Sequence, residues 1–246
     1  VIAGDGCLME GISHEVASLA GHLSLSNLIV LYDDNEISID GPISLTMSDK
    51  TLDRFLSYGW HVESVDGYDL DEINLAIGKA KKEQKPSLIS CKTLIGNGAP
   101  NKQGTAGSHG APLGEDEIKL AKNAMKWNYE PFYVPEEVLK LWRDVGSRNK
   151  QNYQQWIGTK GNKVKSLLFK KSEFNERLGL ARKKSTQYFL GNPKEIATRK
   201  SSEIVLSHIM KQELNLLGGS ADLTGSNNTY VKEMSVINKQ NFKGNY

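Results

Sequence analysis

Two apolar periodicities alternate along the first 96 residues of the chain. Residues 28–32 form an unbroken apolar run, which is typical of a strand buried on both faces of a parallel sheet. Apolar residues at 12, 16, 19, 20 and 23 recur instead at the spacing of one helix face. The pattern predicts strands at 1–3, 28–32, 60–65 and 87–92, and helices at 12–23, 50–57 and 70–83, the last with Asp69 as its N-cap. Such alternation predicts an α/β fold with a doubly wound, mostly parallel sheet and flanking helices.

Beyond residue 96 the pattern predicts a long loop and a largely helical second half. Glycines are frequent between 96 and 114, and loops of that length tend to be functional or disordered. Helices are predicted at 115–127, in the segment up to Trp142 and at 201–213. Residues 146–195 are rich in Lys, Gln and Asn and indicate a helical connection. We therefore expect a first α/β domain, a helical linker and the beginning of a second α/β domain.

Composition and charge exclude several functional classes. The 246 residues are 38% apolar with a formal charge of only +2, which suits a globular protein and provides no strong field for nucleic acid or a membrane surface. No apolar run approaches the roughly 20 residues of a membrane span, and no secretory leader pattern is found. Basic residues cluster between 163 and 184, but interleaved acidic residues and sparse aromatics favour solvated helix faces over a nucleic-acid patch.

The two cysteines and the chain ends carry smaller indications. Cys7 and Cys91 lack the spacing of a metal knuckle and are interpreted as buried thiols of a protein from the reducing cytoplasm. Residues 1–3 are typical of a strand already under way, and the chain stops just after a polar loop. We therefore expect a chain that is cropped at both ends.

Polar residues follow two of the predicted strands. Gly4-Asp5-Gly6 follows the first, where flanking glycines allow a tight turn and close approach of a ligand, and a helix opening there presents N–H groups to a phosphate. Asn35 follows the strand at 28–32, which we expect to neighbour the first. A carboxylate, an amide oxygen and a backbone carbonyl suit Mg²⁺, which takes its other ligands from water and phosphate. The tripeptide alone also fits a plain structural turn, and Asp33 and Asp34 fit a surface turn.

This spacing resembles the diphosphate motif shared by thiamine-diphosphate enzymes. The surrounding blocks GDGCLMEGISHEVASLAG and YDDNEISIDG are similar to those of the transketolase family in particular. Further similar blocks are KTLIGNGAPNKQGTAGSHGAPLG at 92–114, ATRKSS at 197–202 and GGSADLTGSN at 218–227. The resemblance weakens only over about 146–190. It implies a diphosphate-binding domain over 1–165, a linker over 166–192 and the start of a pyrimidine-binding domain over 193–246.

The resemblance also implies how thiamine diphosphate and its metal would bind. Asp5, Asn35 and the Ile37 carbonyl would hold Mg²⁺, with Ca²⁺ or Mn²⁺ as possible substitutes. Gly6 and Asn35 would touch the diphosphate, and Ile39 would line the thiazolium pocket. The cofactor-binding residues implied in this way are Asp5, Gly6, Glu10, Asn35, Ile39, His109 and Asp222.

Other residues are assigned by the same resemblance to substrate and to subunit contacts. His109 would be the catalytic group beside cofactor and substrate. Arg199 and Ser226 would hold the sugar phosphate, a task that suits the guanidinium fork of arginine. Glu10 would join an acidic network at a dimer interface, and Asp222 would approach the cofactor from the second domain.

The implied activity is reversible transfer of a two-carbon ketol unit. Xylulose 5-phosphate would be the donor, and ribose 5-phosphate or erythrose 4-phosphate the acceptor, in a cytoplasmic homodimer with active sites at its interface. The family's segment before residue 1, and the glutamate and aromatic that serve the aminopyrimidine ring beyond Tyr246, are not in this chain. We therefore expect ketol transfer from the full-length enzyme and none from this chain alone.

Two alternatives stay open. A dihydroxyacetone-synthase-like ketol transferase shares the same blocks, and a non-catalytic relative would bind thiamine diphosphate without turnover. Deoxyxylulose-phosphate synthases and dehydrogenase E1 components share the diphosphate motif, but the SIDG and SHGAPLG stretches and the pair Arg199 and Ser226 disfavour them. A generic nucleotide-binding domain would require a GxGxxG motif or a Walker lysine, and neither is found.

Overall fold

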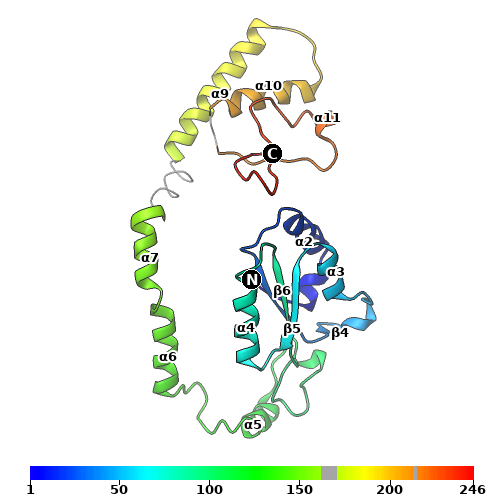
Figure 1. Cartoon of the computed structure of the whole chain (residues 1–246), viewed down its shortest axis with the longest axis vertical. Coiled ribbons are helices and arrows are strands. Elements are labelled where there is room, and N and C mark those ends of the chain that lie inside the picture. The colour runs from blue at the N-terminus through cyan, green and yellow to red at the C-terminus, as the bar shows by residue number, and fades with distance from the viewer. Residues whose placement is uncertain (162–170, 213–214) are drawn as a thin grey trace. The chain divides into compact units, whose positions relative to one another are not determined.

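The computed structural model describes residues 1–161, 171–212 and 215–246 (Figure 1). These residues form two compact units, 1–133 and 134–246. The domain boundary expected between 165 and 166 lies outside the described residues, and the division at 165 and 192 stays a prediction. No helix in the described part of the chain combines the length and the apolar character needed to cross a bilayer.

A four-stranded parallel sheet forms the centre of the first unit. Its strands are β1 (Ile2–Gly4), β2 (Ile29–Asp34), β5 (His61–Asp66) and β6 (Ser87–Lys92). They lie in the order β1-β2-β6-β5, and each neighbouring pair is parallel. The four predicted strands are confirmed, with ends shifted by at most two residues, because apolar runs bounded by polar turns are a strong local signal.

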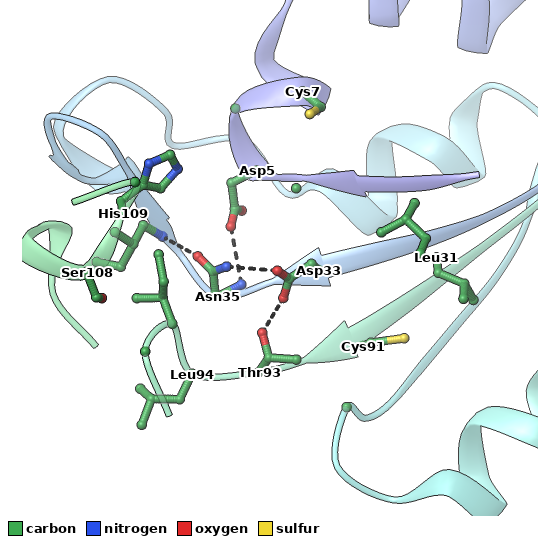
Figure 2. A pocket seen from close by; sticks show the side chains of 18 of the residues that line it. Asp5, Cys7, Leu31, Asp33, Asn35, Cys91, Thr93, Leu94, Ser108 and His109 are labelled. Carbon is green, nitrogen blue, oxygen red and sulfur yellow. Dashed lines mark hydrogen bonds between the residues drawn. The ribbon is translucent and has the colours of Figure 1, made fainter. Parts of the chain in front are cut away.

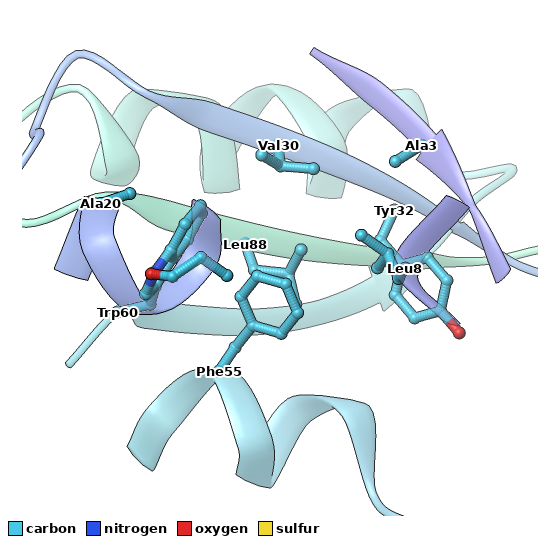
Figure 3. Packing of buried hydrophobic residues seen from close by; sticks show 9 residues of the cluster. Ala3, Leu8, Ala20, Val30, Tyr32, Phe55, Trp60 and Leu88 are labelled. Atoms are coloured by element: carbon cyan, nitrogen blue, oxygen red, sulfur yellow. The ribbon is translucent and has the colours of Figure 1, made fainter. Parts of the chain in front are cut away.

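Helices cover both faces of this sheet, which makes the fold doubly wound as expected. The helices of the first unit are α1 (Asp5–Met9), α2 (Gly11–His22), α3 (Thr51–Ser57), α4 (Leu70–Ala80) and α5 (Glu115–Ala124). On one face Val30 and Leu88 join Phe55 of α3 in a buried cluster (Figure 3). On the other face Ile89 packs with Ala76 of α4. Alternate strand residues point to opposite sides, so β2, β5 and β6 contribute to both clusters, whereas β1 contributes Ala3 to the first alone.

Local sequence rules account for the details of these elements. The Asp69 side chain caps α4 by accepting hydrogen bonds from the backbone N–H groups of Asp71 and Glu72, at 2.9 and 3.0 Å. All residues of β6 from Ser87 to Cys91 are buried, as expected for a central parallel strand. In β2 only alternate residues are fully buried, so the expectation of burial on both faces was wrong in that detail.

Short elements complete the first unit: β3 (Ile37–Ser38), β4 (Gly41–Pro42), η1 (Ile43–Leu45) and η2 (Ala106–Ser108).

The second unit is mostly helical. Its described helices are α6 (Glu136–Ser147), α7 (Lys150–Trp156), η3 (Ile157–Gly161), α9 (Lys171–Gly191), α10 (Thr198–Met210) and α11 (Thr224–Asn227). A hydrogen bond of 3.0 Å between Ser185 Oγ of α9 and His208 Nδ1 of α10 links these two helices. Met210, Val231 and Met234 form a small core. The described residues beyond 193 form helices, loops and one isolated bridge.

Candidate functional site

The carboxyl ends of β1 and β2 lie side by side at one edge of the sheet. Gly4 is in register with Asp33, so Asp5 and Asn35 leave neighbouring strands at the same level. This confirms the expected adjacency of the two strands. It also brings together two polar side chains that are thirty residues apart in the sequence.

The segment around Asp5 differs from the tight turn that we expected. Gly4 is extended, with φ −95° and ψ −179°, and α1 begins immediately at Asp5. Neither Gly4 nor Gly6 has a positive φ, so the glycines do not serve backbone conformation here. A Cβ atom at either position would meet nothing within 4 Å. The two glycines therefore leave open space beside Asp5, which suits the close approach of a ligand.

The Asp5 carboxylate is buried and receives three hydrogen bonds. Its Oδ2 accepts from the backbone N–H of Asn35 at 3.2 Å and of Glu36 at 2.9 Å, and its Oδ1 accepts from the Tyr32 hydroxyl. Burial raises the pKa of Asp5 above its ordinary value of 3.8, although these donors lower it. A divalent cation at this carboxylate would remove the cost of its buried charge.

The segment after β2 holds Asn35 in a defined orientation (Figure 2). Asn35 Oδ1 accepts from the Ile37 backbone N–H at 3.1 Å, and its Nδ2 donates to Asp33 at 3.2 Å. The Thr93 hydroxyl donates to the other oxygen of Asp33. The two hydrogen bonds fix the orientation of the Asn35 amide. Its Oδ1 has a second lone pair that could bind a metal. The hydrogen bond from Thr93 to Asp33 joins β2 to the residue that follows β6 and was not predicted from the sequence.

Glu36 makes the sharp change of direction between β2 and the β3–β4 hairpin. Its φ is +63°, a left-handed conformation that is uncommon for a residue other than glycine. This conformation accompanies the hydrogen bond from its N–H to Asp5 and is followed by Ile37 at the start of β3. The sequence carried no glycine here to indicate it.

Most of the predicted cofactor residues line one cavity of about 950 Å³. Of the predicted residues, those at this cavity are Asp5, Gly6, Glu10, Asn35, Ile37 and His109. Ile39 is 72% exposed and is not among the lining residues. Cys7 and Cys91 also line the cavity, and Cys7 is exposed rather than buried as we had interpreted it. Most of the predicted residues thus lie at one cavity, and residues that were not predicted complete its lining.

His109 reaches the cavity from the loop that follows β6 (Figure 2). Its Nδ1 is buried and has no hydrogen-bond partner within the described structure. A buried polar atom without a partner is costly in a folded protein, so the orphaned Nδ1 marks an unmet hydrogen bond in a residue that lines the cavity. The residue before His109 packs tightly against the start of the loop, because a Cβ atom at Gly96 would lie 2.8 Å from Ser108.

A carboxylate on α5 fastens the same loop. Glu117 is buried and accepts from the backbone N–H of Asn101 at 2.7 Å and from its Nδ2 at 2.8 Å. The hydrogen bonds from the Asn101 side chain and backbone lower the pKa of Glu117 below its ordinary value of 4.5. This contact ties the glycine-rich loop to a helix and was not predicted from the sequence.

Replacing Glu117 by glutamine is expected to loosen the loop at 96–110. The glutamine NH₂ group would face one of the two Asn101 N–H donors and could not accept its hydrogen bond. We therefore expect amide hydrogen exchange in this loop to become about tenfold faster.

The folded-state pKa of Glu117 is depressed, so the stability that the Glu117 carboxylate contributes is present above pH 4.5. That stability is lost as the pH falls through the lower folded-state pKa. Glu115→Gln, an exposed change on the same helix, is the control. Equal exchange in both variants would contradict the role of this contact.

The predicted residues of the second unit lie in three places. Arg199 is on α10, Ser226 is on α11, and Asp222 precedes α11 with φ +59°; all three are exposed. Their roles toward cofactor and substrate stay predictions.

The donor set around Asp5 suits a hard cation supplied with phosphate oxygens. Within the described residues no group of three or more His, Cys, Asp or Glu side chains is positioned to hold a metal by itself. Asp5, the Asn35 side chain and a backbone carbonyl offer oxygen atoms, and Mg²⁺ commonly completes such a set with phosphate and water. The residues present therefore fit a magnesium–diphosphate group.

Comparisons with known proteins agree with this fit. Residues 1–181 match the family model described as transketolase, thiamine diphosphate binding domain. The chain is 44% identical over 258 residues to transketolase from Buchnera aphidicola subsp. Schizaphis graminum, and 44% identical over 262 residues to transketolase 2 of Escherichia coli K12. In both comparisons all of this chain is covered, together with 38% of the relative.

Solved structures give the same result. Transketolase from Leishmania mexicana superposes with a TM-score of 0.79 at 33% identity, covering all of this chain and 38% of that one. A transketolase from Pichia stipitis in complex with sedoheptulose 7-phosphate superposes with a TM-score of 0.76 at 40% identity, covering 95% and 36%.

The parallel sheet, with a buried aspartate and an asparagine at one edge, thus defines a thiamine-diphosphate-binding α/β domain. The chain belongs to the transketolase family. It spans about 38% of the length of the relatives to which it was compared.

Proposed function

We propose that this chain supplies the metal–diphosphate part of a transketolase active site, and that the full-length protein transfers two-carbon ketol units between sugar phosphates. Xylulose 5-phosphate is the proposed donor, and ribose 5-phosphate and erythrose 4-phosphate are the proposed acceptors. The observation that carries the proposal is the buried Asp5 carboxylate beside Asn35, in a cavity that His109 also lines.

Each residue of the cavity has a proposed task. Asp5 and Asn35, with the Ile37 carbonyl, would hold Mg²⁺, and the open space at Gly6 would admit the diphosphate. Thiamine diphosphate, when bound, supplies the carbanion chemistry that breaks and re-forms the C–C bond. The His109 ring would exchange a hydrogen bond or a proton with an oxygen of the substrate.

The remaining assignments are proposed for the full-length protein. Arg199 and Ser226 would bind the sugar phosphate, with Asp222 and Ile39 near the cofactor. The active sites would lie at the interface of a homodimer, where Glu10 contributes. The diphosphate-binding domain would extend over 1–165, followed by a linker to 192 and a pyrimidine-binding domain.

A ketol-transfer assay tests the proposal. The full-length protein is expected to convert xylulose 5-phosphate and ribose 5-phosphate only with both thiamine diphosphate and Mg²⁺, and the 246-residue chain alone is expected to be inactive. His109→Ala should lower kcat/KM by about 100-fold, a typical loss for an acid–base group. His22→Ala, an exposed change at the end of α2, is the matched control. Magnesium-dependent cofactor binding without turnover would instead indicate a non-catalytic relative.

A further inference from the structure

Tyr32 connects the hydrophobic core to the candidate metal site. It lies on β2, is only 2% exposed, and belongs to the buried cluster that includes Leu8 and Phe55 (Figure 3). Its hydroxyl is the one polar group of this side chain, and it donates to Asp5 Oδ1. The ring is thus fixed by apolar packing, and the hydroxyl is directed at the carboxylate.

The donors to Asp5 hold its two oxygens from different directions. Oδ2 is held by the backbone N–H groups of Asn35 and Glu36, and Oδ1 by Tyr32. All of them come from β2 and the residues directly after it. The two N–H groups follow any movement of that loop, whereas the Tyr32 hydroxyl is anchored in the core. The carboxylate therefore has one donor whose position does not depend on the loop conformation.

We propose that Tyr32 is a positioning residue of the metal–diphosphate site, whose hydroxyl holds the Asp5 carboxylate in the orientation that binds a divalent cation. The proposal rests on the function proposed above, in which Asp5 is a metal ligand. Groups that hydrogen-bond to a metal ligand orient it, and losing one commonly costs about 10- to 100-fold in metal affinity. Without this hydrogen bond the carboxylate would be held at Oδ2 alone, by the backbone N–H groups of Asn35 and Glu36, and its orientation would follow that loop.

Tyr32→Phe in the full-length protein tests the proposal, with Mn²⁺ as an observable probe for the metal. The variant keeps the ring in the core and removes only the hydroxyl. In the presence of thiamine diphosphate, the dissociation constant of Mn²⁺ measured by electron paramagnetic resonance is expected to rise about tenfold. Tyr58→Phe is the matched control, because its hydroxyl borders the same cluster and contacts His14 Nδ1 at 3.4 Å instead of Asp5. The control should change the constant less than about twofold.

Asp5→Asn separates failure of this proposal from failure of the proposed function. If Asp5→Asn leaves Mn²⁺ affinity unchanged, Asp5 is not a ligand and the proposed function of the site is wrong. If Asp5→Asn weakens binding while Tyr32→Phe matches Tyr58→Phe, only the role of Tyr32 is wrong. A hydroxyl that acts through Asp5 should also add little once Asp5 is replaced, so a full additive loss in the double variant contradicts the proposal.

Ligand-free stability distinguishes positioning from damage to the core. Tyr58→Phe removes a hydroxyl that contacts His14, whereas Tyr32→Phe removes one that donates to the buried Asp5 carboxylate and also bonds Thr51. The melting temperature of Tyr32→Phe should therefore fall at least as far as that of Tyr58→Phe. If Tyr32→Phe melts lower, the Mn²⁺ titrations are repeated at a temperature where near-ultraviolet circular dichroism shows all variants folded. A difference in Mn²⁺ affinity that disappears there would be an effect of unfolding and would overturn the proposal.

Discussion

Gly21→Ala is expected to lower the free energy of unfolding by about 3 kcal/mol, although alanine is the better helix former. Gly21 lies near the end of α2, where a Cβ atom would come within 1.8 Å of the Tyr58 carbonyl oxygen and 2.9 Å of its carbon. Those atoms are backbone and cannot turn aside as a side chain can. The nearby hydrogen bond from Trp60 Nε1 to the Ala17 carbonyl, at 2.8 Å, fixes the same approach of α2 to the turn before β5.

Urea unfolding of the two glycine variants measures this effect. Gly78→Ala is the matched control, since Gly78 lies in the interior of α4 and a Cβ atom there meets nothing within 4 Å. The control is expected to raise the free energy of unfolding by about 0.5–1 kcal/mol, which is the ordinary difference in helix propensity. Two variants of equal stability would show that α2 does not approach Tyr58 as closely as described.

Asp5→Asn is expected to weaken the binding of metal and thiamine diphosphate by at least about 100-fold and, at neutral pH, to stabilise the ligand-free protein. The loss of affinity follows because an amide replaces the only buried carboxylate that we assign to the metal. The gain in stability follows because burial raises the pKa of Asp5, so that the ionised form is disfavoured in the folded state. Function and stability would then change in opposite directions at one residue, as is common at binding sites.

The stability gained by Asp5→Asn should depend on pH in a definite direction. A carboxyl whose folded-state pKa is raised contributes its stability below the unfolded value, here 3.8, and loses it as the pH rises through the folded value. The melting temperature of Asp5→Asn relative to the parent should therefore increase between about pH 4 and pH 7 without metal or cofactor. Asp53→Asn on α3 is an exposed control and should show no such trend. A difference that is constant over this range would contradict the prediction.

Local patterns determined much of this protein. The apolar runs placed all four strands of the sheet, and the capping rule placed Asp69 at the start of α4. Asp5 and Asn35 were predictable as partners because parallel strands present their carboxyl ends at one edge. His109 came from a resemblance of the surrounding residues, and the structure places it at the same cavity. These features depend on residues that are close in sequence, or on a rule that holds for every parallel sheet.

Only the tertiary structure decided how the site is held. The Tyr32 hydroxyl under Asp5, the Thr93 hydroxyl on Asp33 and the Asn101 contact with Glu117 join segments from 16 to 60 residues apart. The spacing of apolar residues along the sequence does not predict such contacts, because they depend on the register and the packing distance of whole elements. Gly21 shows the limit most clearly, since helix propensity favours alanine there and the nearby Tyr58 backbone excludes it. The sequence by itself thus determined which groups meet at the sheet edge, and the fold decided how each is oriented.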